Sequence, residues 1–238
     1  MNTANSKNAF VPLLLSCLVM IFISGCATPV MVTKGQKYPL LYEERPNTIV
    51  VLPPINNTTA ADAKEYYSTT IAQPLAFAGF YVIPTEPTLA ILKGQGLYDT
   101  EILLNQPVAK FKEFFGADAV LYTTITKWNK SYAVLAASLT VSIDAKLKST
   151  KTERTLWEYS GTLVADLSAN SNSGNPLADL IVKAVVTSIN AALADYVPYA
   201  QLANTQMLQS IPLGKYHPRH GQDKDDKMQD LRVGKEYK

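Results

Sequence analysis

The chain has 238 residues, of which 47% are hydrophobic and 18% charged, a balance typical of a folded protein rather than a disordered one. Its 22 basic and 20 acidic residues give a formal charge of +2, which excludes a strongly basic nucleic-acid-binding protein. Two cysteines are too few for a disulfide framework or a four-cysteine zinc site.

An apolar segment without charged residues, 9–23, follows a polar N-terminus whose one basic side chain is Lys7. Its fifteen residues are few for a helix that must cross about 30 Å of hydrocarbon at 1.5 Å per residue. They are typical of the apolar region of a secretory signal peptide. The sequence therefore predicts a signal peptide over residues 1–25, and Cys17 is expected to leave with it.

The sequence ISGC at residues 23–26 resembles the bacterial lipobox. The resemblance implies cleavage between Gly25 and Cys26 and transfer of diacylglycerol to the Cys26 thiol, so that this cysteine becomes the first residue. The alternative is an uncleaved membrane helix, since no charge follows Lys7 until Lys34. Gly25 and Pro29 argue against such a helix.

Both flanks of the expected domain are predicted to be loosely ordered. Residues 26–47 contain three prolines and no sustained periodicity, so we expect the lipidated cysteine to be followed by a flexible tether. Residues 214–238 carry seven basic and five acidic residues and predict a solvated, polar tail. A single α/β domain then spans residues 48–213.

Within this domain, short apolar runs predict three strands, at 48–52, 81–83 and 118–128. Helical composition predicts helices at 60–73, 87–92 and 101–115, the first capped by residues 56–59 and ended or kinked at Pro74. After a loop at 169–174, we expect helices at 175–196 and from Pro198 to about residue 210.

Two further segments, 139–147 and 157–167, alternate apolar and polar residues, which predicts two half-buried antiparallel strands joined by a hairpin. Only registers of one parity place both apolar sets on one face. Among these, the register with Lys146 opposite Glu158 and Lys148 opposite Leu156 avoids facing like charges and puts residues 151–153 at the tip. The whole order, β-α-β-α-β-β-β-α, predicts a mixed α/β fold with helices packed on a mixed sheet.

The sequence offers few residues for catalysis. Asp144, Glu158 and Asp166 lie on the polar sides of their strands, and paired carboxylates of this kind can hydrolyse glycosidic bonds only within a cleft. We expect them to be solvated or paired with Lys146 and Lys148.

The two histidines, His217 and His220, both lie in the expected tail, with three aspartates nearby. A zinc site needs three or four ligands in fixed geometry, and this tail gives them no rigid support. We therefore predict no metal site, no cofactor and no catalytic residues.

Four segments carry a family resemblance: PLAFAGFYVIP (74–84), GADAVLYTTITKW (116–128), VSIDAKLKSTKTERTLWEY (141–159) and IPLGKYHPRHGQD (211–223). With the lipobox, they resemble a family of bacterial lipoproteins of unknown function that includes a neisserial surface-antigen candidate. The resemblance implies a fold similar to the periplasmic domains of the curli-secretion lipoprotein and the Tol translocation protein. It supplies no catalytic residues, and Lys215 departs from the Gly-Pro-Tyr-His-Pro run expected there.

These observations predict a lipid-anchored lipoprotein of the cell envelope that is not an enzyme and acts as an assembly or interaction module. Its expected partners are membrane lipid, through acylated Cys26, and envelope proteins or a second copy of itself. Ala27, rather than the aspartate that retains lipoproteins in the inner membrane, favours the outer membrane and its periplasmic face. The alternative is an envelope enzyme or small-ligand binder whose site is built from dispersed residues.

Overall fold

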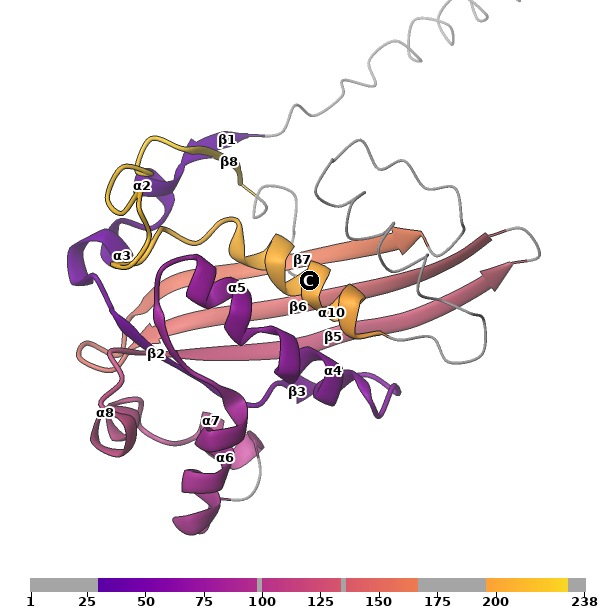
Figure 1. Cartoon of the computed structure of the whole chain (residues 1–238), viewed down its shortest axis with the longest axis horizontal. Coiled ribbons are helices and arrows are strands. Elements are labelled where there is room, and N and C mark those ends of the chain that lie inside the picture. The colour runs from indigo at the N-terminus through magenta and orange to yellow at the C-terminus, as the bar shows by residue number, and fades with distance from the viewer. Residues whose placement is uncertain (1–29, 98–99, 134–135, 167–195, 231–238) are drawn as a thin grey trace, which may run out of the picture. The chain divides into compact units, whose positions relative to one another are not determined.

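The computed structural model describes residues 30–97, 100–133, 136–166 and 196–230, and most of its strands form one mixed sheet (Figure 1). The sheet has the order β4-β2-β5-β6-β7. β2 (Thr48–Val51) lies between β4 (Tyr81–Ile83) and β5 (Ala119–Ala133), and is parallel to both. β6 (Ala136–Ser149) and β7 (Thr155–Asp166) continue the sheet as antiparallel strands. The expected mixed α/β fold is confirmed.

A short strand, β3 (Ile55–Asn56), was not expected and also pairs in parallel with β5. Pro53 and Pro54 separate it from β2, because proline has no N–H group to donate to the ladder. Residues 56–59 therefore do not cap a helix as predicted. Instead, Oδ1 of Asn56 accepts hydrogen bonds from N and Oγ1 of Thr58, at 3.1 and 2.7 Å, and the helix begins only at residue 63.

One face of the sheet is covered by α4 (Ala63–Thr70), α5 (Ala72–Phe77) and α10 (Val197–Leu208), the last close to its predicted bounds (Figure 1). The break between α4 and α5 falls at Ile71 rather than at Pro74. A proline in the first turn of a helix costs little, because its missing N–H would have no partner there, so Pro74 is accommodated in α5. Large buried side chains fill the space between these helices and the sheet: Tyr67, Leu75, Leu121, Trp157 and Met207.

The opposite face is covered only in part, by α6 (Thr85–Gly94), α7 (Thr100–Leu104) and α8 (Ala109–Phe115). The single helix expected over 101–115 is thus two helices, and Pro107 lies in the segment between them. A smaller cluster around Leu92 and Phe111 packs these helices on β2 and the start of β5. In the described part of the chain, no helix covers the rest of this face, over β6 and β7.

The predicted hairpin register is confirmed at its centre, where Lys146 lies opposite Glu158 and Asp144 lies opposite Ser160. The prediction for Lys148 was wrong, because an irregularity after Leu147 places it opposite Thr155 instead of Leu156. The extra residue lets two consecutive apolar side chains, Leu156 and Trp157, both be buried.

The segment expected to be a flexible tether is folded from Met31 onward. It forms β1 (Met31–Thr33), α2 (Lys34–Lys37) and α3 (Pro39–Glu44). Tyr38 and Leu41 are each only 4% exposed and belong to the main core. Burial of these two apolar side chains stabilises a segment that its prolines alone would leave extended.

The expected polar tail also differs from the prediction over residues 214–230. Its strand β8 (Lys227–Gln229) pairs with β1 in a second, antiparallel sheet, and Asp223 is fully buried. The predicted loop at 169–174 and helix at 175–196 lie outside the described residues, as do the signal peptide and Cys26. Among the helices that the structure describes, none is long and apolar enough to cross a membrane.

Candidate functional site

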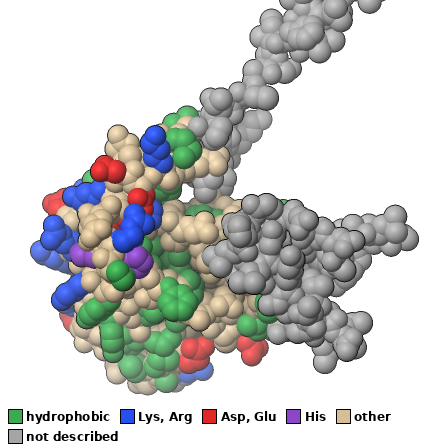
Figure 2. All heavy atoms as spheres, turned by 45° about the horizontal axis from the view of Figure 1, so that its top comes forward, with side chains coloured by type: hydrophobic (Ala, Val, Ile, Leu, Met, Phe, Trp, Pro, Cys, Tyr) green, Lys and Arg blue, Asp and Glu red, His purple; other side chains and the backbone are tan. Residues whose placement is uncertain are grey.

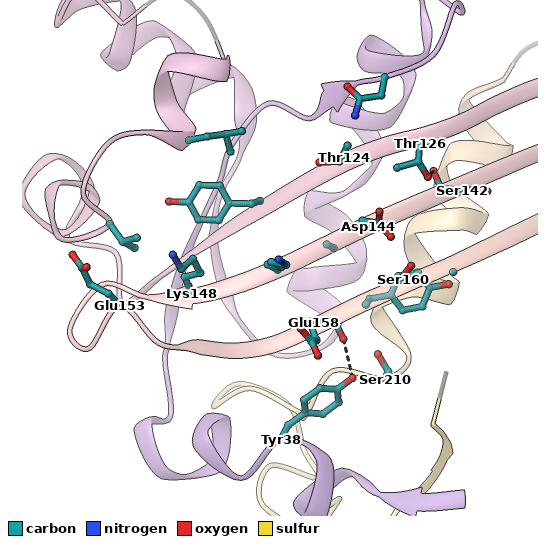
Figure 3. A pocket seen from close by; sticks show the side chains of 18 of the residues that line it. Tyr38, Thr124, Thr126, Ser142, Asp144, Lys148, Glu153, Glu158, Ser160 and Ser210 are labelled. Carbon is teal, nitrogen blue, oxygen red and sulfur yellow. Dashed lines mark hydrogen bonds between the residues drawn. The ribbon is translucent and has the colours of Figure 1, made fainter. Parts of the chain in front are cut away.

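The uncovered part of the sheet forms the floor of a groove with a volume of about 1070 Å³ (Figure 3). Residues 104–108, between α7 and α8, line one side of it. Tyr38 and Met228, from the two terminal segments, line it beside β7. Successive side chains of a strand point to opposite faces of the sheet, and in these strands the polar ones point to this face. The floor of the groove is therefore polar. Its side chains include Thr124, Thr126, Ser142, Asp144, Lys146, Lys148, Glu158 and Ser160.

The charges on the floor alternate in sign rather than converge. Lys146 lies directly opposite Glu158, and Asp144 lies opposite the hydroxyl-bearing Ser160. Asp144 is exposed, whereas a general acid needs a carboxyl group that burial keeps protonated. These are cross-strand pairs on a solvent-exposed sheet surface, and each such pair contributes a few tenths of a kcal/mol to the stability of the sheet.

Asp166, the third acidic residue expected on this surface, lies far along β7 from Glu158. It pairs with Ser138 at the opposite end of the hairpin, eight residues along β7 from Glu158. At about 3.3 Å per residue this corresponds to roughly 26 Å, too far for joint acid–base chemistry. The structure therefore brings two of the three predicted carboxylates onto the same floor and separates the third.

Two tyrosines of the groove were not among the site residues predicted from the sequence, although Tyr122 was expected at the edge of the core. The hydroxyl of Tyr38 donates a hydrogen bond of 3.0 Å to the backbone carbonyl of Glu158, which fixes α3 against the edge of β7. The Tyr122 hydroxyl is buried and has no hydrogen-bond partner among the described residues. Burial, with a smaller contribution from the negative charge of Glu153, raises the pKa of Tyr122 to about 12. This hydroxyl therefore stays protonated and can donate a hydrogen bond.

A second group of residues joins the two ends of the described chain. Residues 31–47 and 211–230 pack together, and we call them the terminal module. The backbone N–H of Lys34 donates to Asp226 O at 3.0 Å and that of Gly35 donates to Lys224 O at 2.9 Å, so the start of α2 is held by the C-terminal segment. The side chains of Thr33 and Gln36 complete a capping box at the same helix.

The centre of the terminal module is a buried ion pair. Nζ of Lys34 lies 3.8 Å from Oδ2 of Asp223 and donates a hydrogen bond of 2.9 Å to the carbonyl of Ile211. Oδ2 of Asp223 also accepts a 2.8 Å hydrogen bond from the N–H of Leu213. Burial lowers the pKa of Lys34, although the neighbouring carboxylates of Asp223 and Asp226 raise it. This pair could not be found from composition, which predicted that both residues would be solvated.

The histidines of this module are held by local hydrogen bonds. Nδ1 of His217 accepts a hydrogen bond of 3.1 Å from the N–H of Arg219, and Nδ1 of His220 lies 2.9 Å from the carbonyl oxygen of Leu213. Among the described residues, no three His, Cys, Asp or Glu side chains are close enough together to hold a metal ion.

Comparison with known proteins places the chain in a family. The family model described as "Putative lipoprotein GNA1162-like" matches residues 36–215, which include most of the groove and most of the core. The chain belongs to the GNA1162-like lipoprotein family. Within it, "Putative lipoprotein NMB1124/NMB1162" of Neisseria meningitidis serogroup B is 33% identical over 184 residues, 77% of this chain and 83% of the relative.

A solved structure from the same family agrees with this assignment. The crystal structure of lipoprotein GNA1162 from Neisseria meningitidis is 34% identical and matches with a TM-score of 0.50, over 60% of this chain and 96% of that one. The PelC dodecamer of Paraburkholderia phytofirmans is 14% identical, with a TM-score of 0.41 over 79% of this chain and 96% of that one. A likeness that low has no bearing on function.

Proposed function

We propose that this GNA1162-like lipoprotein is anchored in the outer membrane by lipid on Cys26 and acts there as a non-catalytic assembly module. The ISGC sequence at residues 23–26 and the family to which the chain belongs support the anchor. Each buried methylene contributes about 0.8 kcal/mol, so two or more acyl chains hold a protein stably at a bilayer. Ala27 supports transfer to the outer membrane.

The observation that carries the non-catalytic part is the chemistry of the groove floor. Asp144 is exposed, and Glu158 faces a lysine across the strand pair, so neither carboxylate lies in the buried setting of a general acid. A broad floor of hydroxyl, amine and carboxylate groups instead matches the polar surface of a protein partner, which it can meet through hydrogen bonds and ion pairs.

A second candidate function, binding of a small ligand, is favoured by one specific feature. Tyr122 is one of the residues that line the groove, and its buried hydroxyl lacks a partner among the described residues. A buried donor of this kind costs free energy unless something accepts its proton, and a bound ligand with an acceptor oxygen would do so.

The anchor is tested by palmitate labelling with membrane fractionation. The wild-type protein should be labelled and recovered with the outer membrane, whereas Cys26→Ala should remain unlabelled as a precursor. Equal labelling of both proteins, or a mature wild-type chain that still contains residues 1–25, would contradict the anchor.

The role of the groove is tested by a photoreactive amino acid at position 144, with position 113 on the exposed surface of α8 as the matched control. In intact cells the groove position should crosslink to an envelope protein of defined mass, and the control should not. Adducts that contain only small molecules would favour the ligand-binding function. The same adducts at both positions would contradict a specific role for the groove.

A further inference from the structure

The terminal module begins very close in sequence to the proposed anchor. Only residues 27–30 separate Cys26 from Met31, the first residue of β1. Five peptide steps span at most about 18 Å even when fully extended. A tether that continued to residue 47, as expected from the sequence, would have allowed about 75 Å. Because β1 is paired with β8, the start of the folded domain cannot move farther from the lipid than the shorter limit.

This limit brings the module within electrostatic range of the membrane. The polar headgroup layer is about 5–8 Å deep on each side of the bilayer. The remaining distance is of the same order as the Debye length, about 8 Å at physiological ionic strength. With Cys26 acylated, charged side chains near Met31 would therefore lie within reach of the phosphate groups of the leaflet that holds the anchor.

The pairing of β1 with β8 determines which side chains point outward. Met228 packs against the main core, and its cross-strand partner Val32 lies on the same face of the β1–β8 sheet. The residues that alternate with these two therefore face away from the core. Those residues include Met31, which is 54% exposed, and Lys227, which is exposed and lies opposite Thr33. Met31 and Lys227 thus lie on the same outward face of the β1–β8 sheet, where an apolar side chain and a cation are both available to a lipid headgroup layer.

Further cations lie on the same module. Figure 2 shows Lys, Arg and His side chains, with Asp and Glu side chains among them, on the side of the domain where Figure 1 places α2, α3 and the C-terminal segment. Arg45, His220 and Lys224 line a hollow of about 260 Å³ between α3 and that segment, large enough to admit a phosphate group. Two acidic residues of the module, Glu43 and Asp225, are also exposed.

The other carboxylates of the module are already engaged. Oxygens of Glu44 accept hydrogen bonds from the hydroxyls of Ser149 and Thr152. The remaining three face cations of the module itself, in the pairs Lys34–Asp223 at 3.8 Å, Lys37–Asp230 at 2.7 Å and Arg219–Asp226 at 2.9 Å. Arg45, Lys215, Lys224 and Lys227 form no ion pair within the described residues.

We propose that the outward surface of the terminal module, centred on Met31, Lys224 and Lys227, docks on the anionic phospholipid headgroups of the membrane that holds the anchor. The inference rests on the proposed acylation of Cys26, which supplies the short link. Docking orients the domain relative to the bilayer, because the lipid anchor alone fixes only one point of the chain.

The test uses the full, lipidated protein in vesicles of phosphatidylglycerol and phosphatidylcholine. Cys17 and Cys26 are the two cysteines of the sequence, and acylation with signal-peptide removal leaves no free thiol. A fluorophore can therefore be attached specifically to Gln229→Cys in β8 or, as the control, to Glu113→Cys on α8. Nitroxide-labelled headgroups should quench the fluorophore at position 229 at least threefold more than the one at position 113.

Charge dependence is tested with the double variant Lys224→Glu/Lys227→Glu, with Lys93→Glu on the exposed end of α6 as the control. Each lysine near an anionic leaflet favours the docked state about fivefold, so the double variant, pure phosphatidylcholine or 0.5 M salt should each abolish the excess quenching. Lys93→Glu should leave it unchanged.

Equal quenching at positions 229 and 113 in a palmitate-labelled protein would overturn the docking while leaving the anchor intact. Excess quenching that persists in pure phosphatidylcholine would overturn recognition of anionic headgroups. Absence of palmitate on the wild-type protein would overturn the anchor and the docking together, so failures of the two proposals are distinguishable.

Discussion

Gly214 is a position where a single added methyl group should cost considerable stability, because its backbone touches that of Gly79. A Cβ on Gly214 would fall against the Gly79 carbonyl group, 2.6 Å from the carbonyl carbon and 2.8 Å from Cδ1 of Phe80. Ordinary contact begins at 3.4 Å. Gly214→Ala must therefore move the C-terminal segment away from the end of α5 by about 0.8 Å, in an interior that is already close-packed.

This displacement acts on the two backbone hydrogen bonds that hold the segment in place. The N–H of Gly214 donates to Ala78 O at 2.7 Å, and the N–H of Tyr216 donates to Gly79 O at 2.9 Å. Each bond contributes about 1 kcal/mol net, and overpacking a filled site costs about 1–3 kcal/mol. Gly214→Ala should therefore lower the free energy of unfolding by about 3–5 kcal/mol.

Urea unfolding of the chain from residue 27 onward, followed by circular dichroism, measures this loss. With a slope of about 2 kcal/mol per molar urea, the midpoint should fall by about 2 M. Gly94→Ala is the matched control, because Gly94 ends α6 and no atom lies within 4 Å of the added Cβ. Alanine there should be neutral or stabilise by up to about 1 kcal/mol. A loss below 1 kcal/mol for Gly214→Ala would refute the close approach as the basis of this packing.

Two further predictions concern charged groups. Burial raises the pKa of Asp118, but hydrogen bonds from Lys112 and from two backbone N–H groups at the start of β2 outweigh it and hold the pKa below the ordinary value of 3.8. Its stabilisation is therefore complete above that value and is lost as the pH falls through the folded pKa, so Asp118→Asn should flatten the acid limb of stability measured by urea unfolding. Lys34→Met should cost about 3–5 kcal/mol, because it leaves the Asp223 carboxylate buried without its cation, and adding Asp223→Asn should recover part of this loss. Strictly additive losses in that double-mutant cycle would contradict the ion pair.

The hairpin shows what can be predicted from local pattern. The alternation of apolar and polar residues predicted which face of β6 and β7 is buried. Pairing Lys146 with Glu158 was predicted because it keeps like charges from lying opposite each other, and the structure has this pair. The irregularity beside Leu156 could not be predicted in this way. It depends on a pocket in the core that accepts Leu156 and Trp157 together, and only the packed helices create that pocket.

The groove and the terminal module escaped prediction because both are made by contacts between distant segments. Composition assigned Lys34 and Asp223 to solvent, yet each offsets the cost of burying the other. Tyr38 lies between two helices too short to show a period, and its hydrogen bond to Glu158 joins it to a strand far along the chain. The resemblance of residues 211–223 to the lipoprotein family was a signal of order in the C-terminal segment that its charge content obscured.

The folded terminal module also limits how far from the membrane a partner can bind the groove. Lys37, Tyr38 and Met228 of the module line one end of the groove, so this end belongs to the same compact unit as β1. With Cys26 acylated as proposed, β1 begins within about 18 Å of the anchor, whereas a tether to residue 47 would have let the folded domain begin up to about 75 Å from it. A partner that binds this end of the groove must therefore come close to the membrane that holds the anchor. Because the domain cannot extend to meet it, the partner is expected to be attached to the same membrane or to extend to that membrane's surface.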